Sequence, residues 1–248
     1  MKHFSIIFIY LFAAISIAAA QDFVTRGKIE YEVKRKNKRM YTAQQRADNP
    51  WISALPEFDI SYRELIFSWN QSIYQYGRKG NSDQPYNNEN VAYINLDKQQ
   101  VIKKQRFIDE YNIMEDSVKK IRWKLENETR KIAGWECRKA VGRIYDSIYV
   151  VAFYCPEIVP QGGPELFTGL PGMILGVAIP RFYTTWFATK IEIASIDETN
   201  IIPPVIKKSK QYSKKELADI LLKKYKEAGW WKDVTLEKVL ESISGYML

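Results

Sequence analysis

Two glutamates, Glu157 and Glu165, are the residues best placed in this sequence for acid–base chemistry. Paired carboxylates can act as general acid and general base in a hydrolase, although only their closeness in sequence favours this role here. The single histidine, His3, lies in an N-terminal segment that we expect to be removed. A chain without histidine cannot use Ser-His-Asp or Cys-His nucleophiles, nor histidine-ligated metals. We therefore expect no enzyme, no cofactor and no metal site.

The two cysteines, Cys137 and Cys155, lie in GWECRKAVGRIYDSIYVVAFYC (134–155). If residues 145–147 form a hairpin loop, Ile144 pairs with Ile148, and Cys137 lies opposite Cys155. In an oxidising compartment this arrangement predicts a buried cross-strand disulfide, worth about 3 kcal/mol. Two reduced, packed thiols are the alternative. The side chains expected to point inward on this hairpin are those of Trp135, Cys137, Val141, Val151, Phe153 and Cys155.

The stretch GGPELFTGLPGMILGV (162–177) combines glycine and proline with large apolar residues. Its glycines permit positive-φ turns or close backbone approach, and its prolines stiffen the path. Two interpretations of its apolar side chains stay open. A rigid loop could fold them back to plug an open sheet, or they could form an exposed ridge that docks on a partner or lines a ligand groove. The candidate binding residues of this loop are Phe167, Gly169, Leu170, Pro171, Gly172, Met173 and Ile174.

The elements that must position these residues are mainly β-strands. Segment 27–36 alternates apolar and charged residues, as a half-buried strand does, and similar runs recur through 65–76, 90–96, 100–108 and 119–126. About ten short strands predict a curved antiparallel sheet or partial barrel. Residues 39–57 interrupt this rhythm with a short helix or ordered loop that could cover one mouth of the sheet.

The two ends of the chain differ from its middle. Lys2, an apolar stretch and Ala18–Ala20 have the build of a secretory signal peptide, with an uncleaved anchor as the alternative. Near the C-terminus, Ser213 with Glu216 forms a capping box, Gly229 supplies a stop, and a second helix begins near Thr235. The expected organisation is a signal peptide (1–20), an antiparallel β domain (21–206) and a basic C-terminal helical segment packed on the sheet (207–248).

The charge of the chain is basic, with a formal net value of +8. Such a charge favours anionic surfaces such as lipid headgroups or an acidic partner. Nucleic acid is not expected, because no reading motif is present in a chain predicted to be exported. The basic residues lie in scattered doublets, which are typical of a solvated surface.

Residues 134–140 (GWECRKA) and 152–177 (AFYCPEIVPQGGPELFTGLPGMILGV) resemble the GLPGLI family of exported Bacteroidetes proteins. The hexapeptide is Gly169-Leu170-Pro171-Gly172-Met173-Ile174, with Met173 where the family has leucine. The resemblance is strong over 119–180 and loose elsewhere. It implies a small secreted protein, often encoded beside TonB-dependent outer-membrane receptors. The implied fold is a curved antiparallel sheet similar to the half-barrels of lipoprotein carriers, and the resemblance implies no activity.

We therefore expect an exported, non-catalytic binding or accessory protein in the periplasm. Its expected partner is an outer-membrane protein, either a TonB-dependent receptor or a transport complex. The alternative is a carrier for a lipid or other hydrophobic ligand, held in a cavity lined by Trp69, Trp123 and Trp135. We expect no transmembrane helix in the mature chain, since no later segment is sufficiently apolar.

Overall fold

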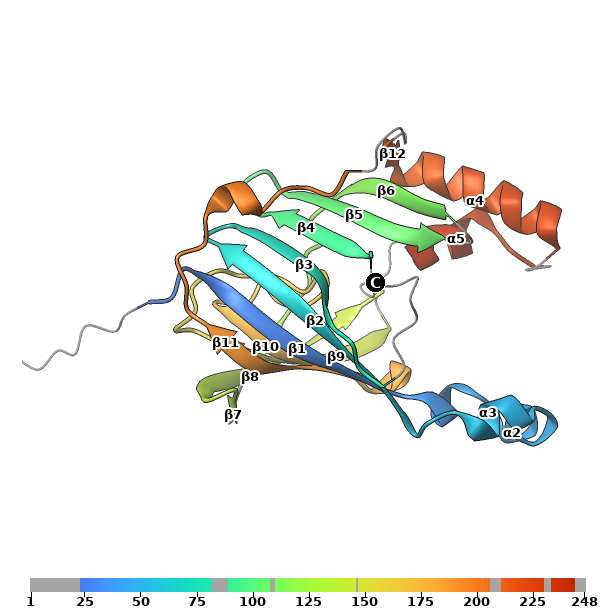
Figure 1. The fold of residues 1–248 in the computed structure, drawn as a ribbon, viewed down its shortest axis with the longest axis horizontal. Coiled ribbons are helices and arrows are strands. Elements are labelled where there is room, and N and C mark those ends of the chain that lie inside the picture. The colour runs from blue at the N-terminus through green and yellow to red at the C-terminus, as the bar shows by residue number, and fades with distance from the viewer. Residues whose placement is uncertain are drawn as a thin grey trace, which may run out of the picture.

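The computed structural model describes residues 23–81, 89–107, 110–145, 147–205, 211–229 and 233–243. Its strands form one open, strongly curved sheet, with helices only at the margins (Figure 1). The predicted mainly-β fold with C-terminal helices is confirmed. The predicted signal peptide, residues 1–20, lies outside the described residues.

Within the described residues the sheet has twelve strands, in the order β12-β6-β5-β4-β3-β2-β1-β11-β10-β9-β8-β7. Neighbouring strands are antiparallel, except that β12 runs parallel to β6. In chain order they are β1 (Arg26–Lys36), β2 (Phe58–Ser68), β3 (Gln71–Arg78), β4 (Val91–Asn95), β5 (Gln100–Phe107), β6 (Glu110–Ser117), β7 (Lys124–Ile132), β8 (Trp135–Ile144), β9 (Ile148–Cys155), β10 (Met173–Ile179), β11 (Thr184–Glu192) and β12 (Gln211–Ser213).

The main core lies on the concave side of this sheet. Strand β1 shows why the chain folds this way, because Ile29 and Tyr31 are fully buried while the charged residues between them are only partly buried. Alternation of this kind directs one face of a strand inward. The same core includes Phe67 of β2, Tyr74 of β3 and Trp186 of β11, so it extends across most of the sheet.

The β8–β9 hairpin has the predicted register. Ile144 pairs with Ile148, and the ladder continues to Arg138 and Tyr154. The predicted inward face is wrong near the hairpin end, where Val141 and Val151 are only partly buried. Gly142 faces the core instead, because Trp123 and Ile121 pack where its Cβ would be. The buried residues of this part of the hairpin are Ala140, Gly142, Ile144, Ile148, Val150 and Ala152.

The predicted disulfide between Cys137 and Cys155 is not formed, and both cysteines are free, buried thiols. The paired register of β8 and β9 ends one position earlier, at Arg138 and Tyr154. The Cys137 thiol donates a hydrogen bond to the Trp135 carbonyl, with Sγ 3.6 Å from the oxygen. Burial raises the pKa of Cys137 to about 12 and also raises that of Cys155. The thiolate that begins disulfide exchange is therefore disfavoured.

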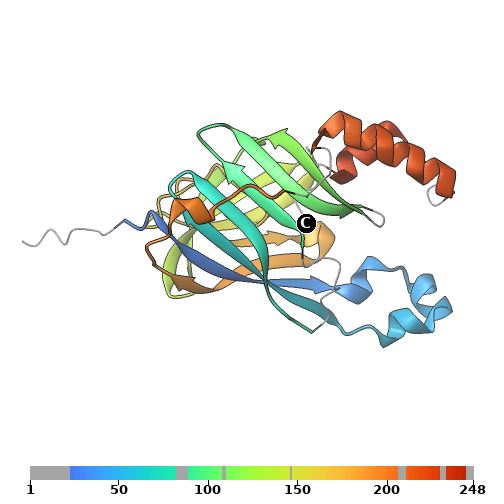
Figure 2. The same ribbon diagram turned by 45° about the horizontal axis from the view of Figure 1, so that its top comes forward.

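Residues between β1 and β2 form a helical excursion. It contains a 3-10 turn (Asn37–Met40), α2 (Ala43–Asp48) and α3 (Pro50–Ala54), and α2 begins at a capping box between Thr42 and Gln45. Both views show the excursion extending away from the sheet (Figures 1 and 2). The expectation that it covers a mouth of the sheet is therefore wrong.

The C-terminal helices, α4 (Lys214–Ala228) and α5 (Leu236–Ile243), pack beside β5 and β6. As predicted, α4 begins at a capping box between Ser213 and Glu216 and ends at Gly229, which has φ 65°. Its buried Leu217 and Leu221 join Phe107 and Met114 of the sheet in a second core. Among the residues that the structure describes, we find no helix both long and apolar enough to span a membrane.

Candidate functional site

The loop between β9 and β10 is buried rather than exposed. Phe167, Leu170, Met173 and Ile174 lie in the main core with at most 1% of their surface accessible. The exposed-ridge interpretation is therefore wrong for these four side chains, which fill the concave side of the sheet. Of the other candidate binding residues, Gly172 is buried, and only Gly169 and Pro171 are exposed.

Glycine is required where this loop meets the sheet. Gly172 has φ 139°, and a Cβ atom there would lie 2.2 Å from the Cys155 carbonyl oxygen. No substituent fits at that distance, since the obstacle is backbone. The Ile174 N–H donates to the Gly162 carbonyl (2.8 Å), and the Met173 N–H donates to the Ile158 carbonyl (2.8 Å). The loop is thus folded onto itself and fixed to the start of β10.

Two ionisable side chains are buried in the interior, Glu165 of the loop itself and Lys103 of β5. Glu165 is buried and accepts a hydrogen bond from the Trp186 indole N–H at 3.1 Å. Lys103 of β5 is also buried, and burial lowers its pKa to about 8, although the Glu165 carboxylate opposes this shift. Glu157 is only partly buried, and neither glutamate lines the two hollows described below. The proposed carboxylate pair is therefore not assembled at either of them.

Residues 118–123 connect β6, which is second from one end of the strand order, to β7, which is at the other end. The connection is held to the hexapeptide loop because the Trp123 indole N–H donates to the Thr168 carbonyl at 2.9 Å. Trp123 and Ile121 also pack against Gly142 of β8. The segment is thereby fixed between the loop and the β7 end of the sheet, and a hollow lies on each side of it.

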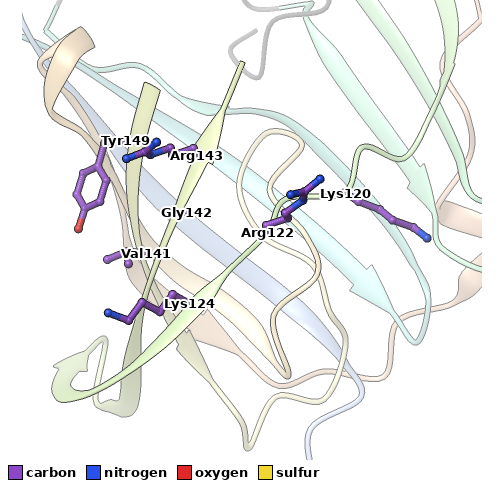
Figure 3. A pocket seen from close by; sticks show the side chains of 7 residues that line it. All are labelled: Lys120, Arg122, Lys124, Val141, Gly142, Arg143 and Tyr149. Atoms are coloured by element: carbon purple, nitrogen blue, oxygen red, sulfur yellow. The ribbon is translucent and has the colours of Figure 1, made fainter. Parts of the chain in front are cut away.

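The first hollow, here called the basic groove, has a volume of about 590 Å³ (Figure 3). It lies where residues 120–124 diverge from the β8–β9 hairpin. In the ladder Lys124 is opposite Val141, and Arg143 is opposite Tyr149, so these side chains share the outer face of the sheet. The groove is lined by Lys120, Arg122, Lys124, Val141, Gly142, Arg143 and Tyr149.

The four basic side chains of this groove are exposed, and none forms an ion pair with a described residue. Some cations elsewhere on the sheet face carboxylates. Arg78 Nε lies 2.8 Å from the Glu30 carboxylate, and this hydrogen bond lowers the pKa of Glu30. Lys139 Nζ, on β8 itself, lies 2.6 Å from the Glu128 carboxylate. The groove therefore concentrates uncompensated positive charge, which attracts anions.

The second hollow, here called the mouth hollow, has a volume of about 560 Å³ and shares Lys120 with the basic groove. It lies among the β2–β3 turn, the β4–β5 turn, residues 118–121 and the loop. The two turns lie at the end of the sheet away from α2 and α3 (Figure 1). Its lining residues are Trp69, Asn70, Leu96, Asp97, Gln99, Val118, Lys119, Lys120, Ile121, Val159, Pro160, Gln161, Thr168 and Gly169.

The structure separates the residues predicted to act together. Of the loop candidates, only Gly169 lines a hollow. Trp69 lines the mouth hollow, while Trp123 and Trp135 pack against the main core. The sequence analysis does not predict the basic groove, because its lysines and arginines are typical of scattered, solvated surface charge. The available signal was the alternation of Lys120, Arg122 and Lys124, which places these three cations on one side of an extended segment.

Solved structures with a similar fold include two of PNGF-II, determined in different space groups. They match with TM-scores of 0.55 and 0.52, at 16% and 18% identity, over 79% and 83% of this chain. These matches show a shared fold. This chain spans about a third of each PNGF-II chain, 33% and 32%.

An uncharacterized conserved protein from Thermus thermophilus is also similar, with a TM-score of 0.42 and 7% identity. The match covers 78% of this chain and 93% of that one, and a score of this size carries no argument about either protein. No family model and no curated protein matches the sequence.

Within the described residues, no group of three or more potential ligands could hold a metal ion.

Proposed function

We propose that this protein is an exported, non-catalytic binding protein that recognises an acidic region of a partner through the basic groove. One observation carries the proposal. Four exposed cations from two segments, 120–124 and 141–149, line one hollow without carboxylate partners among the described residues. Like charges around one hollow repel one another, and an anionic partner relieves that repulsion.

We further propose that the partner is an outer-membrane protein, either a TonB-dependent receptor or a transport complex. This step rests on the resemblance of residues 119–180 to the GLPGLI family and on the signal-peptide pattern of residues 1–20. The residues that line the basic groove all lie inside that resembling span. The surface that this proposal assigns to the partner is therefore part of the segment that carries the resemblance.

The carrier hypothesis is less favoured by the packing. A lipid held inside the curved sheet needs the space that Phe167, Leu170 and Met173 fill in the main core. Trp123 and Trp135, two of the three tryptophans expected to line its cavity, belong to the packing around that core instead.

Native mass spectrometry of the tagged protein, purified gently from its own cells, tests the proposal. The wild type is compared with Arg122→Glu/Arg143→Glu and with Lys215→Glu/Lys226→Glu, which makes the same charge change on exposed positions of α4. We expect an outer-membrane protein bound stoichiometrically to the wild type and the α4 variant, and lost from the groove variant. A complex that survives the groove substitutions contradicts the proposal. A bound mass of several hundred daltons on a lone chain favours the carrier instead.

A further inference from the structure

The mouth hollow has an unusual aromatic residue at its rim. Trp69 and Asn70 form the two-residue turn between β2 and β3, where Ser68 pairs with Gln71. Trp69 has φ 47° and is 52% exposed. Turns of this length favour asparagine or glycine, and a bulky residue with positive φ is an outlier. Such a conformation is strained, and a half-exposed side chain recovers little of the strain energy by burial.

The rim that carries Trp69 is rigid, because backbone hydrogen bonds connect its segments in succession. The Val159 N–H donates to Val24, and the Trp69 N–H donates to Thr25. The Leu96 N–H then donates to Asn70, and the Val118 N–H donates to Gln99, with all four donor–acceptor distances between 2.8 and 3.1 Å. The Trp123 indole N–H, hydrogen-bonded to the Thr168 carbonyl, connects the segment that begins at Val118 to the loop. The hollow is therefore formed before any ligand arrives, as small-molecule sites usually are.

The side chains around Trp69 restrict what the hollow can bind. Lys119 and Lys120 line it, so a cationic ligand that would stack on the indole is repelled. Asn70 Nδ2 donates a hydrogen bond to Asp97 Oδ1 at 2.8 Å. A wholly apolar ligand would strip water from Gln161, and from the Asn70 and Asp97 atoms that this bond does not use, without replacing their hydrogen bonds. A nucleotide could stack on Trp69, but it offers fewer hydroxyl groups than an oligosaccharide to Asp97 and Gln161, whose side-chain oxygens accept hydrogen bonds.

A ligand with an apolar ring face, several hydroxyl groups and a negative charge satisfies all of these constraints. We propose that the mouth hollow binds an acidic oligosaccharide. One sugar ring stacks its C–H face on the Trp69 indole, while its hydroxyl groups bond to the amide and carboxylate groups of Asn70, Asp97 and Gln161. Its acidic group lies at Lys120, which forms no ion pair with a described residue and lines both hollows.

The volume of about 560 Å³ falls within the range of roughly 300–1,000 Å³ that is usual for ligand pockets. Lys120 lines both hollows, but Arg122 and Arg143 line only the basic groove, so substituting these two arginines tests the partner proposal separately. A failure of one proposal can therefore be told from a failure of the other.

The test is binding to a printed array of oligosaccharides, half of which carry a carboxylate or sulfate and half of which are neutral. Five proteins are compared: the wild type, Trp69→Asn, Trp51→Ala, Lys120→Met and Arg122→Glu/Arg143→Glu. Asparagine suits the left-handed turn, so Trp69→Asn keeps the fold. Trp51, on the remote excursion, is a matched control because it is also more than half exposed.

We expect the wild type to retain acidic members of the array, and Trp69→Asn to bind them at least tenfold more weakly. Trp51→Ala and the groove variant should keep binding, and Lys120→Met should lose the preference for acidic over neutral members. Any one of three results would overturn the proposal. The wild type retains no acidic member, Trp69→Asn binds as the wild type does, or an eight-residue oligothymidylate displaces the bound sugar.

Discussion

The hexapeptide loop and the basic groove lie close together, since Trp123 of the connecting segment bonds to Thr168 of the loop, yet they differ in every physical respect. The loop is apolar, closely packed and rich in backbone constraints. The groove is charged and exposed, and its cations lack partners among the described residues. The comparison teaches that the most unusual stretch of sequence serves the fold, while the surface suited to recognition is made of ordinary residues.

Of the substitutions that distinguish the two regions, we expect Leu170→Ala to change the free energy of unfolding most. Leu170→Ala removes a fully buried side chain, and such truncations lower the free energy of unfolding by about 2–5 kcal/mol. Chemical denaturation measures the loss. Pro171→Ala, at an exposed neighbouring position, is the matched control and should change stability far less. Equal effects of both substitutions would mean that the loop is not part of the core.

The second test concerns the backbone of the loop. Gly172→Ala places a methyl group 2.2 Å from the Cys155 carbonyl oxygen at φ 139°. We expect a loss of about 2 kcal/mol or more, since strained backbone alone costs about 1–3 kcal/mol. Gly134→Ala is a useful control, because Gly134 has φ 87° but nothing within 4 Å of its Cβ position. A thermal melt in which Gly172→Ala matches Gly134→Ala would contradict the role assigned to this contact.

The buried Lys103 gives a test based on the pH dependence of stability. Lys103 has its pKa lowered to about 8 by burial, so between pH 8 and the unfolded value of about 10.4 the unfolded chain binds more protons. Its contribution to stability therefore rises with pH in that window. Burial raises the pKa of Cys137 and of Cys155 and so acts in the opposite direction above about pH 8.5.

A comparison with Lys103→Met isolates the lysine, because the cysteines are common to both proteins. The stability difference, wild type minus variant, should grow by about 1 kcal/mol between pH 8 and pH 9, at up to 1.36 kcal/mol per unit. Urea denaturation at both values measures it. A difference independent of pH would show that Lys103 titrates as an exposed lysine does.

The smallest stability effect is expected in the groove itself. Arg122→Gln/Arg143→Gln removes repulsion without breaking an ion pair between described residues, so stability should change by no more than about 0.5 kcal/mol. Arg78→Gln removes the ion-pair partner of Glu30 and should lower stability slightly more, since exposed ion pairs stabilise only weakly. Differential scanning calorimetry compares the melting temperatures of the groove variant and Arg78→Gln. A groove variant that melts well below Arg78→Gln would indicate that the groove cations hold the fold together.

The sequence predicts most of the strands and the β8–β9 register, because alternation and turn length determine both locally. The strand predicted at 119–126 is wrong in its first half, since residues 118–123 are a connection and β7 begins at Lys124. It cannot predict that Gly142 replaces Val141 on the core face, since Trp123 and Ile121 that pack on Gly142 come from a separate segment. The fate of the hexapeptide side chains also depends on the curvature of the whole sheet. The groove joins residues about twenty positions apart, where the β7–β8 ladder ends at Lys124 and Val141, and no local pattern predicts this.

Nuclear magnetic resonance titration of the purified protein with inorganic pyrophosphate tests the central claim most directly. The account predicts shifts of backbone amide signals confined to residues 120–124 and 141–149, with those of lysine-rich α4 unchanged. Shifts spread evenly over α4 and the groove, or absent from the groove, would contradict the claim that this hollow is the recognition surface.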